Sequence, residues 1–168
     1  MHDTFVLMKG NNMHRLFILF ILLLPILVFC TERETIRDAH GKVVGTATTD
    51  GNKTVYRDAS GKITGTATTS GNKTTYRDAS GRTTGTATES GNRTTFRDSS
   101  GKTTGTATTN GNRTTFREAS GTSAGSATSN GNRTTYRDAH GSTVGTSTST
   151  GTGLGVSQTP PILNPTSK

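Results

Sequence analysis

Residues 76–96, YRDASGRTTGTATESGNRTTF, begin with an aromatic residue and end with the aromatic residue that starts the next copy of the same pattern. The pattern recurs every twenty residues, and six copies fill residues 31–150. Each copy has an arginine at the same place: Arg37, Arg57, Arg77, Arg97, Arg117 and Arg137. Such repetition indicates one supersecondary unit used in tandem, in which neighbouring units cover each other's apolar surface.

Each copy contains two turn signals. The segment DASG places Asp78 at the first position and Gly81 at the fourth, as type I turns prefer. The segment SGNR places Gly91 and Asn92 at the centre of a hairpin turn of type II′ or I′. The equivalent turn residues of the neighbouring copy are Asp58, Gly61, Gly71 and Asn72.

The segments between the turns are six to eight residues long and rich in β-branched threonine, which favours strands. We therefore expect an all-β chain of tandem 20-residue β-hairpins, with about twelve strands in an extended antiparallel meander or an open solenoid-like sheet. The meander is favoured, because a tight solenoid would stack Arg57, Arg77 and Arg97 at ~4.8 Å from one another.

One aromatic residue closes each of five copies: Tyr56, Tyr76, Phe96, Phe116 and Tyr136. With two-residue loops, Tyr76 would lie opposite Ala67 on one side and Thr83 on the other. All aromatic residues would then share one face with glycine and alanine, and the opposite face would carry Thr and Arg. A bulge at the Asp-Ala-Ser-Gly turn would instead place successive aromatic residues on opposite faces.

The composition excludes a conventional close-packed core. Hydrophobic residues make up 27% of the 168 residues, and most large aliphatic side chains lie before residue 31. Such a segment has little apolar surface to offset the entropy of ordering, so disorder of the isolated repeats is the alternative to a folded sheet. Cys30 is the single cysteine, so an internal disulfide cannot stabilise the chain in place of a close-packed core.

Residues 1–30 predict a signal peptide or a membrane anchor. Fifteen apolar residues, LFILFILLLPILVFC, follow basic residues, and they are shorter than the ~18–20 residues that span a bilayer comfortably. The start is Met1 or Met13. Cys30 is a candidate for lipidation, although Phe29 stands where a lipobox has a small residue. We expect export to the cell envelope or secretion, and a disordered tail over residues 151–168, which are rich in Gly, Ser, Thr and Pro.

No pattern of residues points to catalysis, a cofactor or a metal ion, and we predict that the chain is not an enzyme. His40 and His140 occupy turn positions that carry serine in other copies. The recurring aspartates suggest calcium, but each follows an arginine and the nonapeptide calcium pattern is missing. Turn capping is the better interpretation of these aspartates.

The segment from Gly71 to Arg82, GNKTTYRDASGR, resembles the YD repeats of RHS-type bacterial surface proteins. The resemblance covers about residues 33–145. It implies hairpins in an extended, curled sheet, on an exported protein that binds or encloses rather than catalyses. Arg77 stands where YD repeats usually have a second tyrosine, Thr83 where they have leucine, and Glu118 and Thr122 depart from the motif.

The net charge of +8 is compatible with an acidic surface polymer as a partner or with self-association, and the N-terminal segment or a lipid on Cys30 would supply membrane contact. A solvated surface of mixed charge is the favoured interpretation of this charge, because Arg and Asp usually stand side by side. Nucleic acid is not expected as a partner. We expect a structural or adhesive surface module. The alternatives are a polymerising matrix or fibre subunit and, less favoured, an ice-binding protein that uses the Thr-x-Thr arrays.

Overall fold

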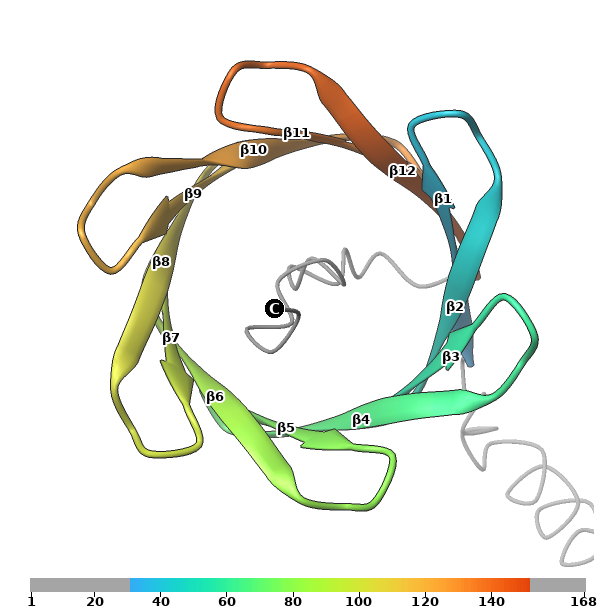
Figure 1. The fold of residues 1–168 in the computed structure, drawn as a ribbon, viewed down its shortest axis with the longest axis horizontal. Coiled ribbons are helices and arrows are strands. Elements are labelled where there is room, and N and C mark those ends of the chain that lie inside the picture. Colours follow the sequence, from blue (N-terminus) through green and yellow to red (C-terminus); the bar gives the residue numbers. More distant parts are fainter. Residues whose placement is uncertain (1–30, 152–168) are drawn as a thin grey trace, which may run out of the picture.

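The structure, a computed structural model, describes residues 31–151, which form a closed barrel of twelve antiparallel strands (Figure 1). The six hairpins follow one another around the ring, and their Asp-x-x-Gly turns splay outward. The strands are β1 (Glu32–Asp38), β2 (Val43–Asp50), β3 (Lys53–Asp58), β4 (Ile63–Ser70), β5 (Lys73–Asp78), β6 (Thr83–Ser90), β7 (Arg93–Asp98), β8 (Thr103–Asn110), β9 (Arg113–Glu118), β10 (Ser123–Asn130), β11 (Arg133–Arg137) and β12 (Thr143–Thr150). The predicted signal helix and disordered tail lie outside the described residues.

The prediction of an all-β, antiparallel chain of hairpins is confirmed, but the prediction of an open sheet is wrong. Each strand pairs with its neighbours in the chain, and β1 pairs with β12, in a register that joins Arg33 to Thr150 and Asp38 to Gly145. The two end strands of an open meander would leave a row of backbone N–H and C=O groups unpaired. Pairing of β1 with β12 provides hydrogen-bond partners for the backbone groups of both end strands.

Two features that recur in each hairpin bend the sheet. A bulge lies in the β5–β6 pair, where the register shifts between Tyr76 and Arg77, and the equivalent bulge recurs in the other pairs of this kind. On the other side of β6, a Cβ added to Gly85 would lie 2.5 Å from the carbonyl oxygen of Arg97, so only glycine permits this approach. Bulges and glycines curve a sheet, and repeated in every hairpin they bring β1 to β12.

The aromatic residues share one face, as expected, and that face is the inside of the barrel. Tyr76 pairs with Ala67, as predicted, but its other partner is Gly85 rather than Thr83, which pairs with Arg77. The bulge follows the aromatic position, so it does not move successive aromatic residues to opposite faces. The inner face packs as a thin apolar layer whose best-buried cluster is Ala107, Phe116, Ala127 and Tyr136.

The two turn signals form the turns at the two ends of the barrel. At the Asp-Gly end, Gly81 N–H donates to the carbonyl of Asp78 over 3.0 Å, the bond of the predicted β-turn, and Gly81 has φ +87°. At the Gly-Asn end, Gly91 has φ +59°. Type I′ needs positive φ at both central residues, and no residue other than glycine has it in the described chain. The Gly-Asn turns are therefore of type II′.

Candidate functional site

The inner space of the barrel, which we call the lumen, is encircled by one large side chain from each hairpin. Tyr76 has Ala67 and Gly85 as its lateral neighbours, so each ring covers backbone that small side chains leave bare. Phe116 and Tyr136 are the most buried, with 6% and 5% of their surface exposed. We call this ring of side chains the aromatic belt, although the first hairpin contributes an aliphatic residue. It consists of Ile36, Tyr56, Tyr76, Phe96, Phe116 and Tyr136.

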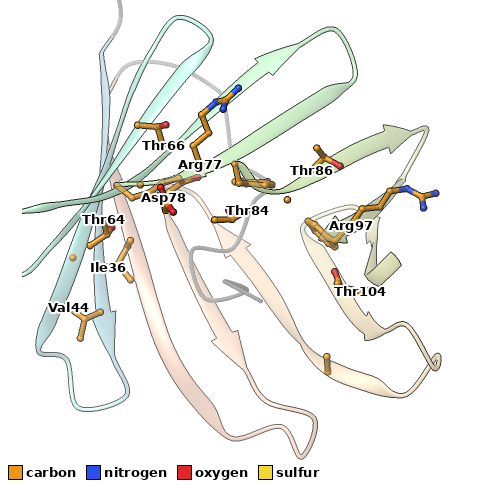
Figure 2. A pocket seen from close by; sticks show the side chains of 18 of the residues that line it. Ile36, Val44, Thr64, Thr66, Arg77, Asp78, Thr84, Thr86, Arg97 and Thr104 are labelled. Carbon is orange, nitrogen blue, oxygen red and sulfur yellow. The ribbon is translucent and has the colours of Figure 1, made fainter. Parts of the chain in front are cut away.

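A cavity of about 820 Å³ opens beside the aromatic belt, and Ile36, Tyr56, Tyr76 and Phe96 contribute to its lining (Figure 2). Strand glycines form part of the wall and leave room that larger residues would fill, and Asp58, Asp78 and several outer-face arginines and threonines line the cavity as well. The side chains of Arg77 and Arg97 extend away from the cavity. Its volume lies within the ~300–1,000 Å³ of small-molecule sites.

Hydroxyl groups line the lumen towards the Gly-Asn end. Thr69 Oγ1 lies 2.9 Å from Thr74 Oγ1, and both residues stand on the inner face by their register with Ala67 and Ala87. Comparable pairs join Thr49 to Thr54, Thr109 to Thr114 and Ser129 to Thr134. The lumen therefore combines an aromatic belt with a layer that can donate and accept hydrogen bonds.

The lumen departs from the repeat where β1 meets β12. Glu34 stands where the five later hairpins have threonine, and Ser147 stands where the five earlier hairpins have alanine. The hydroxyl of Tyr136 lies 3.2 Å from Ser147 Oγ, and Ser147 is also hydrogen-bonded to the Glu34 carboxylate. Ser147 and Tyr136 are buried, with 1% and 5% of their surface exposed, and Glu34 beside them is partly buried, so these residues form a small polar cluster at the seam.

Burial perturbs the acidic groups of this cluster. Desolvation raises the pKa of Glu34, the hydrogen bond from Ser147 opposes the shift, and the nearby charge of Glu32 adds to it. Desolvation likewise raises the pKa of Tyr136 to about 12. It also raises the pKa of Tyr56, with smaller contributions from Tyr76 and Glu34.

The outer face carries the cations of the strands in two belts. The Asp-Gly belt consists of Arg37, Arg57, Arg77, Arg97, Arg117 and Arg137. The Gly-Asn belt consists of Arg33, Lys53, Lys73, Arg93, Arg113 and Arg133. All twelve side chains are exposed. In the Asp-Gly belt each arginine braces its own turn, as Arg77 Nη1 does by donating to the carbonyl of Gly81 over 3.1 Å.

The predicted turn aspartates lie in the Asp-Gly turns. Asp58 Oδ1 accepts from the backbone N–H groups of Ser60 and Lys62 and from the Ser60 hydroxyl. The hydrogen bond from the serine hydroxyl is the largest cause that lowers the pKa of Asp58, and the same holds for Asp78 and Asp98. Residues 31–151 hold no group of three His, Cys, Asp or Glu side chains that could bind a metal ion.

The turn asparagines also connect neighbouring hairpins, which sequence reasoning missed. The carbonyl of Asn72 accepts from Glu89 N–H over 2.9 Å, and Asn72 Nδ2 donates back to Glu89 O over 3.0 Å. The constant position of Asn within the repeat was the sequence signal that could have predicted this contact between neighbouring hairpins. Cys30 lies outside the described residues, so its predicted lipidation stays a prediction.

Comparison with models of protein families and with curated protein sequences gives no match. The resemblance to YD repeats therefore stays a prediction. Residues 31–151 contain no helix that is long and apolar enough to cross a membrane.

Proposed function

We propose that the chain is an exported, non-catalytic module of the cell envelope that attaches to an acidic surface polymer through its outer face. The observation that carries this proposal is the pair of exposed cationic belts. Within one strand, members of the two belts such as Lys73 and Arg77 are four residues apart, which corresponds to ~13 Å along the strand. A flexible polyanion can contact both belts at once.

The hydrogen bonds of the Asp-Gly belt favour this role. Arg97 Nη1 donates to Gly101 O over 3.0 Å, which restrains the side chain before any partner arrives. A guanidinium has about five N–H donors, so most remain for carboxylate or sulfate groups. Restraint before binding reduces the entropy lost on binding. The turn aspartates offset part of this charge, but their Oδ1 atoms already accept backbone N–H groups.

The two alternatives have less support from the geometry. Growth of a fibre by strand addition needs an open sheet edge, and each strand of the described barrel pairs on both sides. Ice binding needs a flat hydroxyl array, whereas Thr66, Thr86 and Thr106 stand on different strands of a curved wall. A polyanion tolerates curvature, because its attraction to cations is not tied to a lattice.

The test is binding of the purified chain to a sulfated polysaccharide such as heparin, with neutral dextran as the control polymer. Replacement of Lys53, Lys73, Arg93 and Arg113 by glutamine removes four cations that brace no turn. We expect at least about tenfold weaker binding, and loss of binding at high salt for the unchanged chain. A matched variant with Thr68→Gln should bind normally. Equal binding to dextran, or no effect of the four substitutions, contradicts the proposal.

A further inference from the structure

We propose that the cavity between the aromatic belt and the Asp-Gly turns binds a small uncharged molecule with an aromatic or aliphatic body. This site lies inside the barrel and does not depend on the proposed attachment of the outer belts to a polymer. Three observations carry it: the uneven filling of the belt, the opening of the cavity at the Asp-Gly turns, and the contacts of the charged residues in its lining.

The aromatic belt is packed on one side of the barrel and open on the other. In the fifth and sixth hairpins, Phe116 and Tyr136 are buried in the apolar cluster and do not line the cavity. In the second to fourth hairpins, Tyr56, Tyr76 and Phe96 are only partly buried and line it. These three rings keep apolar surface that a ligand in the cavity would remove from water.

The size and position of the cavity suit a ligand that enters from the Asp-Gly end. The volume of about 820 Å³ is that of a site for a drug-sized molecule. The lining extends from Tyr76 in the belt to Asp78 and Ser120 in the turns. The hairpins splay outward at this end (Figure 1), so a ligand can reach the rings without separation of paired strands.

The charged residues of the lining nearly balance one another. Three of them are acidic and four are basic: Asp58, Asp78 and Glu118, and Arg57, Arg77, Arg97 and Arg117. Acidic and basic residues alternate around the same end of the barrel, so the cavity has no strong field of one sign that would select a cation or an anion.

The contacts of these charged residues leave the rings as the main surface for a ligand. Asp78 Oδ1 accepts hydrogen bonds from two N–H groups and the serine hydroxyl of its own turn. Arg77 Nη1 donates to Gly81 O over 3.1 Å and to Thr83 Oγ1 over 3.0 Å. The side chains of Arg77 and Arg97 extend away from the cavity (Figure 2). A charged ligand would therefore lose hydration without gaining a buried ion pair, whereas an uncharged body has no such cost.

The experiment measures displacement of a fluorescent probe from the full chain by three ligands that share one body. The probe is N-phenyl-1-naphthylamine, which is uncharged and brightens in apolar surroundings, and the chain contains no tryptophan that would interfere. The ligands are 4-phenylbutanol, 4-phenylbutylamine and 4-phenylbutyrate. We expect the alcohol to displace the probe at concentrations at least about tenfold lower than the amine or the butyrate. Tighter binding of the amine would assign the site to the carboxylates, and tighter binding of the butyrate to the arginines. Either result, or no binding of the probe, overturns the proposal.

Two matched variants, Phe96→Leu and Phe116→Leu, locate the binding. The two residues occupy the same position of the repeat, but Phe96 lines the cavity and Phe116 does not. We expect Phe96→Leu to weaken binding of the probe at least about threefold, and Phe116→Leu to change it less than about twofold. Thermal unfolding should show that both variants are folded.

Phe116 is the more buried of the two residues, so a loss of binding caused by general destabilisation would be larger in Phe116→Leu. Equal effects of the two changes, or no effect of Phe96→Leu, would mean that the probe binds elsewhere on the chain and overturns the proposal. The variant that lacks four cations of the Gly-Asn belt should bind the probe normally, so the two proposals can fail independently.

Discussion

Gly85 lies so close to Arg97 on the neighbouring strand that a Cβ on Gly85 would stand 2.5 Å from the arginine carbonyl oxygen. That oxygen belongs to the backbone of a paired strand and has little freedom to move. We expect Gly85→Ala to lower the free energy of unfolding by about 3 kcal/mol or more, because the two strands must separate locally. Urea denaturation followed by circular dichroism measures this loss.

Gly81→Ala in the same hairpin is the control. Gly81 has φ +87°, and nothing lies within 4 Å of an added Cβ, so the cost there is backbone strain alone. That strain amounts to about 1–2 kcal/mol. Similar losses in the two variants would show that the close approach of β6 and β7 does not require glycine.

The local structure of each hairpin is predictable from the sequence, because it depends on residues close together in the chain. Asp78 and Gly81 specify one turn, Gly91 and Asn92 specify the other, and the Thr-rich segments between them form strands. Period-two alternation places Tyr76 and Ala67 on one face, since that pairing lies across a two-residue loop.

Closure of the barrel is not predictable by the same reasoning. It depends on the sum of six bends, each set by a bulge after the aromatic residue and by the approach of a strand glycine such as Gly85 to the next strand. A pairing scheme drawn on a flat sheet contains neither the bulge nor the close approach of the strand glycine. The seam left a signal in the sequence: Glu34 and Ser147 break the repeat, and β1 and β12 bring them together.

Phe116 tests whether the aromatic belt stabilises the fold. With 6% of its surface exposed, it packs in the cluster that includes Ala107 and Tyr136. We expect Phe116→Ala to reduce the free energy of unfolding by about 3–5 kcal/mol, since the ring loses its contacts and leaves a hole. Val144, which is 40% exposed, gives the control, and Val144→Ala should cost less than about 1 kcal/mol. Equal effects of the two changes would mean that the lumen side chains pack loosely.

The turn between β9 and β10 offers a stabilising substitution. In the preceding hairpin, Asp98 Oδ1 accepts from the N–H groups of Ser100 and Lys102. Glu118 occupies the equivalent place, and Thr122 N–H donates instead to Ser120 Oγ over 3.4 Å, a poor distance. Because a shorter side chain can reach these N–H groups, Glu118→Asp should raise the thermal midpoint by a few degrees. The reverse change, Asp98→Glu, should lower it, and a rise in both variants would exclude this explanation.

Glu34 gives the barrel a dependence of stability on pH. Burial raises the pKa of Glu34 in the folded chain above 4.5, its ordinary value, so the folded state binds more protons than the unfolded state between these two values. Stability due to this group is therefore present at low pH and is lost as pH rises through that interval.

Glu34→Thr removes the effect. We expect the thermal midpoint of the variant, relative to the unchanged chain, to be higher at pH 7 than at pH 4. The turn aspartates are common to both proteins and cancel in the difference, and Tyr56 and Tyr136 stay protonated over this range. A difference that does not change between pH 4 and pH 7 would mean that the Glu34 carboxylate is as well solvated in the barrel as in the unfolded chain.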